Sequence, residues 1–207
     1  TNKSASVWGT SIAAWQFSRR VQLPWASLLP GCAAALAGAL AGAWAVTLVD
    51  GSALRRGLPF ILLAVLLYTL ARKDLGQVHA PRLSAGTQTA VLCAVGAVLG
   101  FYDGFFGPGT GSFFIFALVR LMGWDFLHAS ASAKLLNVAT NAAALALFAA
   151  KGHVWWHLGL VMAATNIAGA LLGARLALKH GSGFVRQVFI VVVTALICKT
   201  GYDAFLR

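Results

Sequence analysis

Long apolar runs constrain the fold of this chain more than any other feature of its sequence. A helix needs about 20 apolar residues to cross a hydrocarbon core of about 30 Å. Runs of that order occupy residues 25–49, 126–150, 154–178 and 184–205. Only 10% of the residues are charged, whereas a soluble domain has roughly 25%. We therefore predict an all-α polytopic membrane protein.

One apolar segment, residues 87–121, is interrupted in the middle by the stretch 100–112, which reads GFYDGFFGPGTGS. Its five glycines and one proline disfavour a regular helix, because proline removes a backbone donor and each glycine costs about 1 kcal/mol. Non-helical backbone at membrane depth is tolerated only where protein or a water-filled cavity satisfies its amides. An interruption of this kind is the best sequence pointer to a transporter's binding site, and we place the function there.

The sequence also repeats itself, because a shift of 131 positions superposes its beginning on its C-terminal part. The aligned pairs include Lys3 with Lys134, Trp25 with Trp156, Gly38 with Gly169, Gly42 with Gly173 and Arg55 with Arg186. We predict two homologous helical repeats with a Gly-rich broken segment: an N-terminally incomplete first repeat in residues 1–72, a hydrophilic linker in 73–86 and a second repeat in 87–207. The two aligned glycine pairs are expected to be core positions of close helix packing.

Two lysines head polar stripes inside apolar segments. Lys134, Asn137 and Asn141 stand at i, i+3 and i+7 and therefore share one helix face, and Lys3 occupies the aligned position in the first repeat. Ionisable groups within a membrane usually serve a function, and two such lysines suit an anion held near the midplane. The alternative is that Lys134 snorkels to the interface, and both possibilities stay open.

Asp103, in the interrupted stretch, has three possible roles: pairing with Lys134, carrying a proton, or capping the half-helix that follows. A half-helix starting near residues 109–112 would present free amides and a positive dipole end to an anion. The predicted substrate-binding residues are Tyr102, Asp103, Gly104, Gly107, Gly109, Thr110, Gly111, Ser112, Lys134, Asn137, Asn141, Asn2 and Lys3.

The remaining composition predicts no cofactor and no metal. The net charge is +11, but the basic residues lie mostly between apolar runs, as juxtamembrane anchors do, so we expect a lipid bilayer as partner and no nucleic acid. The three cysteines are isolated within apolar runs. The five histidines lie near segment ends without ligand spacing and are interpreted as interfacial: His79, His128, His153, His157 and His180.

The stretch 100–112, followed by residues 131–137 with the sequence ASAKLLN, resembles the TauE/SafE family of sulfite and organosulfonate exporters. Thr1-Asn2-Lys3 is similar to the matching motif of that family's first repeat. The resemblance implies a multi-pass protein of the bacterial inner membrane that exports a small sulfur-containing anion. The first repeat's own Gly/Asp motif is absent from this sequence. Oligomeric state is not indicated, and a homo-oligomer is possible.

Three other functions would use some of the same residues or the same fold. A passive anion channel would need the same glycines and lysines, but the repeat favours a carrier. An intramembrane aspartyl protease would need Asp103 and Asp203 as a carboxylate dyad, although the sequence lacks the Gly-x-Gly-Asp pattern of such enzymes. A non-transporting scaffold would have no solute-accessible cavity at residues 100–112. We therefore expect a transporter and not an enzyme.

Overall fold

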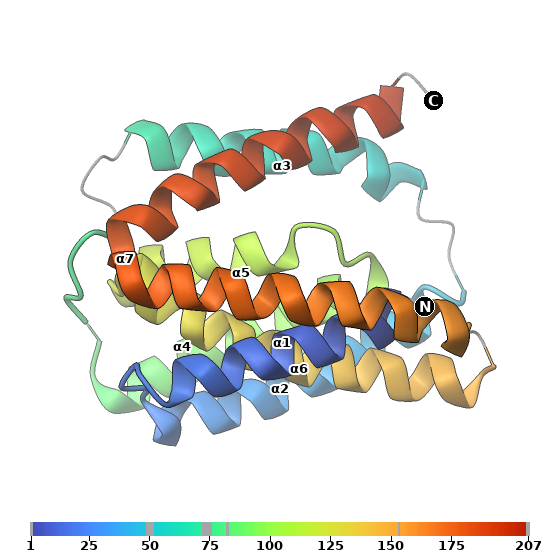
Figure 1. Cartoon of the computed structure of the whole chain (residues 1–207), viewed down its shortest axis with the longest axis horizontal. Coiled ribbons are helices and arrows are strands. Elements are labelled where there is room, and N and C mark those ends of the chain that lie inside the picture. Colours follow the sequence, from blue (N-terminus) through green and yellow to red (C-terminus); the bar gives the residue numbers. More distant parts are fainter. Residues whose placement is uncertain (1, 49–51, 72–75, 82, 153, 206–207) are drawn as a thin grey trace.

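A computed structural model describes residues 2–48, 52–71, 76–81, 83–152 and 154–205 (Figure 1). Every regular element within these residues is helical, which agrees with the predicted all-α class. The elements are α1 (Asn2–Ser18), α2 (Trp25–Ala45), α3 (Ser52–Ala71), α4 (Ala85–Phe105), α5 (Thr110–Ala117), the π-helical turn η1 (Leu118–Met122), α6 (Phe126–Ala150) and α7 (Trp156–Phe205).

Four of the described helices are long and apolar enough to cross a membrane, namely α2, α4, α6 and α7. Large apolar side chains remain exposed on their outer faces, for example Leu29 on α2, Val98 on α4 and Val161 on α7. Such exposure is unfavourable in water but is what a lipid-facing surface requires. The predicted polytopic membrane fold is confirmed.

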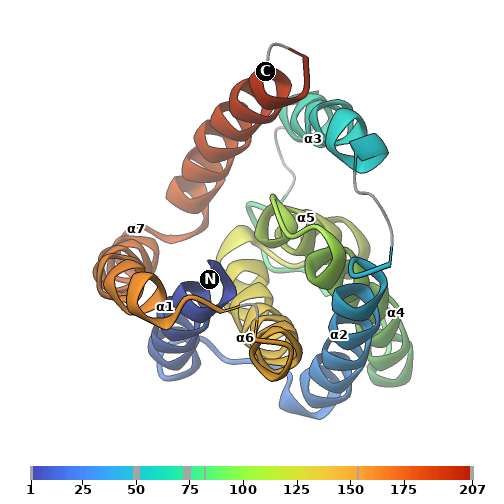
Figure 2. The same ribbon diagram turned by 90° about the vertical axis from the view of Figure 1, so that its right-hand side faces the viewer.

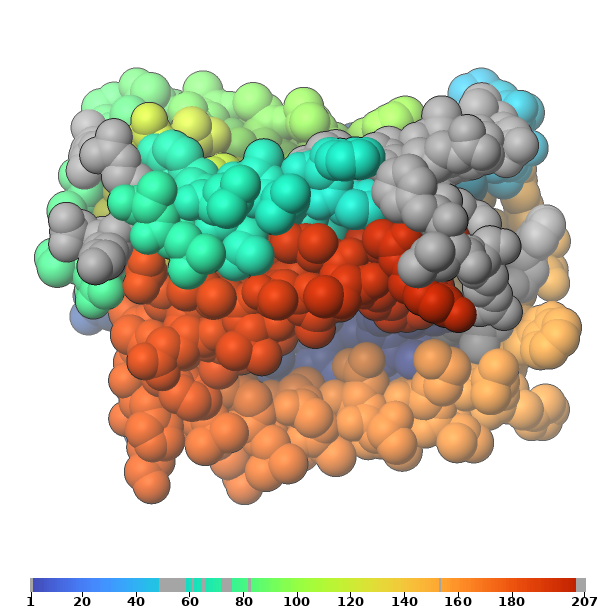
Figure 3. All heavy atoms as spheres, turned by 90° about the horizontal axis from the view of Figure 1, so that it is seen from above, coloured from blue at the N-terminus to red at the C-terminus, as the bar shows by residue number. Residues whose placement is uncertain are grey.

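The helix α7 consists of two parts that diverge at Gly181, whose backbone dihedrals of φ 72° and ψ −165° are not helical. Glycine adopts a positive φ without the steric cost that a side chain would bring. The kink lies inside residues 179–183, where the sequence analysis separates two spans, and Figure 2 shows the two parts pointing in different directions. The second part of α7 packs beside α3 (Figure 3).

The helices α2 and α4 pack with their backbones in close contact. On α2, a methyl group added to Gly38 or Gly42 would overlap the carbonyl oxygens of Ala97 and Phe101 on α4. Three α4 glycines lie equally close to the α2 backbone: Gly96, Gly100 and Gly104. Small residues at helix interfaces permit this approach in membranes, so the packing role predicted for Gly38 and Gly42 is confirmed.

The aligned pair on α7 behaves differently. Gly169 and Gly173 are exposed, and a methyl group added to either would meet no described atom within 4 Å. The expectation that this pair lies in the core is therefore wrong for the described residues. The sequence pattern specifies a surface that permits close packing, but it does not supply the partner helix.

Helix α6 lies at the centre of the bundle and contacts α1, α2, α4, α5 and α7. In Figure 2 it lies between α1 and α2. Its first half is almost entirely buried, including Ala129, Ala131 and Leu136. Polar side chains on this half of α6 therefore face other protein segments and not lipid, which makes them candidates for a site.

Part of the predicted linker 73–86 is docked onto the start of α6. The Ala80 N–H donates to the Gly123 carbonyl, and the Phe126 N–H donates to the Gly76 carbonyl. Helix α4 begins at Ala85, where the Ser84 hydroxyl accepts a hydrogen bond from the Thr87 N–H. The division into two repeats stays a prediction, although α2 and α7 begin at Trp25 and Trp156, two residues that the repeat aligns.

Candidate functional site

The break in the apolar segment 87–121 is shorter than the sequence predicts. Helix α4 continues through Phe105 and α5 begins at Thr110, so only residues 106–109 leave the helical conformation. Gly104 lies within α4 and faces the Ala39 carbonyl of α2. This glycine therefore serves helix packing, whereas the prediction placed it in the binding site.

Hydrogen bonds hold the four-residue break in shape. Gly107 and Gly109 have φ angles of 90° and 80°, a conformation that favours glycine because a Cβ would be strained. The Thr110 hydroxyl donates to the Gly107 carbonyl at 2.7 Å, and the Tyr102 hydroxyl donates to the Pro108 carbonyl. The predicted residues Tyr102, Gly107, Gly109 and Thr110 thus form a constrained turn.

Asp103 forms an ion pair with Lys3 of α1 across the break. The Lys3 Nζ lies 2.7 Å from Asp103 Oδ2, and the two side chains are 15% and 5% exposed. Asp103 does not cap α5, because the N-cap residue is Gly109 and no side chain caps that helix. Of the predicted roles, pairing is the one observed, and the partner is Lys3 rather than Lys134. Asn2, also predicted for the site, is exposed at the start of α1.

A cavity of about 420 Å³ lies between α1, α5, α6 and α7, next to the break. Its polar wall contains Gly111, Ser112, Ser130 and Lys134. The opposite wall is the apolar face of α7, including the exposed Gly169 and Gly173. The sequence predicts a packing role for these α7 glycines, whereas in the structure they line a cavity beside Lys134.

Among the described residues that line the cavity, Lys134 is the only charged one. Within the described part of the chain, no carboxylate lies within ion-pair distance of its ammonium group. A cation withdrawn from water without a partner is costly. An anion entering the cavity would relieve that cost, so the cavity has the electrostatics of an anion site.

Further polar groups on α6 and α5 face the same region. The Ser130 Oγ is buried and has no hydrogen-bond partner among the described residues. A methyl group on Gly111 would come within 3.3 Å of the Asn137 Nδ2, so the Asn137 amide lies against the first turn of α5. Asn141 is also buried, one turn further along α6. The structure thus brings Gly111, Ser112, Lys134 and Asn137 into one region.

The carboxylates proposed for a protease dyad each pair with a lysine. Asp103 pairs with Lys3, and the exposed Asp203 pairs with Lys199 at 2.9 Å within α7. A carboxylate dyad requires the two acids to share a site so that one proton can lie between them. The observed pairings give the protease alternative no geometric support.

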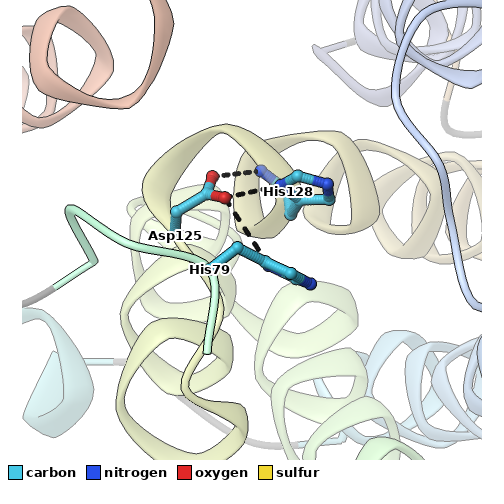
Figure 4. A group of neighbouring side chains, drawn as sticks. All are labelled: His79, Asp125 and His128. Carbon is cyan, nitrogen blue, oxygen red and sulfur yellow. Dashed lines mark hydrogen bonds and ion pairs between the residues drawn. The ribbon is translucent and has the colours of Figure 1, made fainter. Parts of the chain in front are cut away.

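A second polar cluster was missed by the sequence analysis. Asp125, the N-cap of α6, lies 2.6 Å from His128 Nδ1 and 3.5 Å from His79 Nδ1 through its Oδ2 atom (Figure 4). The two imidazole rings stack with centroids 4.0 Å apart. The sequence predicts these histidines to be isolated interfacial residues, because they are not spaced like metal ligands. His79 comes close to α6 only because segment 76–81 docks there.

The environment of this cluster fixes the charge of its carboxylate. Burial raises the pKa of Asp125, but hydrogen bonds from the His128 side chain and backbone and from Ser182 outweigh that effect and lower the pKa to about 2. Burial and the neighbouring His128 lower the pKa of His79. At neutral pH the cluster is therefore an ionised carboxylate beside a neutral imidazole of His79.

Comparison with known proteins identifies relatives over almost the whole chain. The family model described as sulfite exporter TauE/SafE matches residues 1–200. The "Probable membrane transporter protein ORF9" of a Sinorhizobium species is 36% identical over 196 residues, which cover 95% of this chain and 74% of the relative. The "Probable membrane transporter protein YfcA" of Escherichia coli strain K12 is 35% identical over 204 residues, 99% of this chain and 75% of the relative.

A "Probable membrane transporter protein" of Haemophilus influenzae is 36% identical over 166 residues, 80% of this chain and 64% of the relative. No solved structure matches the chain. The names of these relatives state membrane transport but no substrate.

Proposed function

The chain belongs to the TauE/SafE sulfite exporter family, and on that premise we propose that it exports a small sulfur oxyanion or organosulfonate across the bacterial inner membrane. The observation that carries the proposal is the cavity beside the break, where Lys134 is a cation without a carboxylate partner among the described residues. In this proposal the protein acts as a carrier and not as an enzyme.

The polar wall of the cavity binds the charged group of the substrate. Lys134 supplies the counter-charge, and the hydroxyls of Ser130 and Ser112 donate hydrogen bonds. Charge-assisted hydrogen bonds of this kind are about twice as strong as neutral ones. The first turn of α5, which no side chain caps, adds the positive end of a helix dipole. Asn137 orients that turn from α6.

The size and the apolar wall of the cavity favour a sulfonate with a short organic part, as well as sulfite itself. One water occupies about 30 Å³ of liquid, so about 420 Å³ accommodates a small oxyanion together with several waters. Gly169 and Gly173 leave space on the α7 side of the cavity, where a hydrocarbon portion would meet apolar surface instead of polar groups.

Export of an anion needs no dedicated coupling residue. A negative-inside membrane potential favours the exit of an anion by about 2.3 kcal/mol per charge for every 100 mV. The buried Asp103 is engaged by Lys3 and so serves structure in this scheme, not proton transfer.

The test is efflux of sulfite and of a taurine-derived sulfonate anion from proteoliposomes that contain the protein or its Lys134→Ala variant. We expect saturable efflux, and we expect Lys134→Ala to lower kcat/KM at least tenfold, about 1.4 kcal/mol of lost binding. Lys199→Ala is the matched control, because Lys199 is exposed and already paired with Asp203. Efflux that Lys134→Ala leaves unchanged would move the site elsewhere, and absence of efflux for every sulfur anion would reject the substrate class.

A further inference from the structure

The cluster of His79, Asp125 and His128 gathers three metal-binding side chains at one end of the bundle, outside the cavity. Each residue offers one ligand atom, and the three atoms lie within 4.8 Å of one another. His79 comes from the segment between α3 and α4, whereas Asp125 and His128 flank the first turn of α6. Figure 4 shows both imidazoles directed toward the same carboxylate.

One ligand separation already matches a tetrahedral divalent ion, a second must lengthen, and the stacked imidazoles must turn so that both nitrogens face the ion. Zinc binds histidine nitrogen and carboxylate oxygen at about 2.1 Å, which places two ligand atoms of a tetrahedron about 3.4 Å apart. The separation of His79 Nδ1 and Asp125 Oδ2 is 3.5 Å and already matches. His128 Nδ1 and Asp125 Oδ2, now hydrogen-bonded at 2.6 Å, would have to move apart as the ion replaces the shared proton.

Hydrogen bonds to the other carboxylate oxygen, Oδ1, hold the Asp125 side chain in place. Asp125 Oδ1 accepts hydrogen bonds from the Leu127 and His128 backbone N–H groups and from the Ser182 hydroxyl at 2.8 Å. Such outer contacts orient a ligand and leave its second oxygen for the ion. Because Ser182 follows the kink at Gly181, the same carboxylate joins α6 to the bend of α7.

The cluster opens onto a pocket with room for a fourth ligand. A pocket of about 270 Å³ is lined by His79, His128, Gln88 and Ser132, among others. The two imidazoles are 35% and 26% exposed. The Ser132 Oγ, in the wall of this pocket, is fully buried and has no hydrogen-bond partner among the described residues. An open position beside three protein ligands is typical of sites that keep a water or a solute on the ion.

We propose that His79, Asp125 and His128 bind a divalent transition-metal ion of the zinc class at this end of the bundle. Imidazole nitrogen together with carboxylate oxygen suits zinc, copper, nickel or cobalt better than calcium or magnesium. The ion would tie the docked segment 76–81 to the start of α6. This site is independent of the transport proposal, because none of its residues lines the cavity.

The test titrates the purified protein, freed of any histidine tag, with Co²⁺ and then with Zn²⁺. Four-coordinate Co²⁺ absorbs strongly in the visible range, whereas loosely bound, six-coordinate Co²⁺ does not. We expect one saturable equivalent of absorbing Co²⁺ that Zn²⁺ displaces. His79→Gln should weaken binding at least tenfold, since even loss of an outer contact to a metal ligand costs about tenfold or more.

Two further variants separate binding from folding. Asp125→Asn keeps the N-cap, because asparagine caps as well as aspartate, yet it removes the charge and should also weaken Co²⁺ binding at least about tenfold. His180→Gln, at an exposed histidine of α7, should bind like the unchanged protein. The proposal is overturned if the unchanged protein gives no saturable absorption, or if His79→Gln binds as the His180→Gln control does.

Discussion

The helices α1 and α2 and the helices α6 and α7 have aligned sequences but different surroundings. In the first region α4 supplies a partner for each notable residue: Asp103 pairs with Lys3, and the α4 backbone covers Gly38 and Gly42. In the second region the aligned residues have no such partner within the described chain. Lys134 lines a cavity, and a methyl group added to Gly169 or Gly173 would meet no described atom within 4 Å.

This difference separates structural from functional use of one residue pattern. A buried lysine with a carboxylate partner holds helices together. Removing one partner lowers the free energy of unfolding, because the other charge stays buried without a partner. In the transport proposal, a lysine that lines a cavity and has no carboxylate partner binds an anion from outside the chain. The pattern alone, lysine followed by polar residues one turn apart, does not distinguish the two uses, because the partner comes from another helix.

Removing each lysine in turn gives the largest expected difference between the two regions. Lys3→Met leaves the buried Asp103 carboxylate without its ion-pair partner. We therefore expect the free energy of unfolding to fall by about 3–5 kcal/mol. Lys134→Met removes a charge that has no carboxylate partner, so we expect unchanged or slightly higher stability. Unfolding of the detergent-solubilised protein, followed by helix content, measures both values.

Two control variants test whether the loss comes from the unpaired buried charge. Lys199→Met breaks a pair whose side chains are 72% and 41% exposed, and we expect a loss of at most about 1 kcal/mol. Adding Asp103→Leu to Lys3→Met removes the stranded charge and should restore most of the stability. Equal losses for Lys3→Met and Lys134→Met would show that the two lysines have equivalent surroundings, against the structure.

The aligned glycines test the same difference in surroundings, with a smaller expected effect. Gly42→Ala would drive a methyl group into the Phe101 carbonyl of α4, and overpacking of this kind costs about 1–3 kcal/mol. Gly173→Ala meets no described atom within 4 Å, so we expect a change within about 0.5 kcal/mol. The same unfolding measurement checks both, and a large loss for Gly173→Ala would mean that another segment covers that face.

Features that depend on local sequence were predictable. The lengths of the apolar runs predicted the membrane helices. Pro108 and the glycines around it predicted the position of the break, because these residue types disfavour a helix. The break was predicted too wide, since Gly100 and Gly104 look like helix breakers in sequence but serve as contact points for α2. Local propensity cannot reveal a glycine that a neighbouring backbone requires.

Features that depend on contacts between distant segments were not predictable. The sequence left several roles open for Asp103. Its pairing with Lys3 depends on the packing of α1 against α6 and α7, which the sequence alone does not show. The cluster at Asp125 needs the docking of residues 76–81 onto α6, which backbone hydrogen bonds at Gly76 and Ala80 secure. The repeat stays a prediction, because aligned sequences here have unlike surroundings.

Ser130 offers the smallest and most specific test of the difference between the two lysines. If an anion binds beside Lys134, the unpartnered Ser130 hydroxyl donates to it, and Ser130→Ala should raise KM roughly fivefold, about 1 kcal/mol for one hydrogen bond. Ser18→Ala, at an exposed hydroxyl that bonds within α1, should leave KM unchanged. Because Ser130→Ala removes neither charge nor volume of note, stability and kcat should stay constant. A variant with unchanged KM would place the anion away from this face of α6, even where Lys134→Ala abolishes efflux.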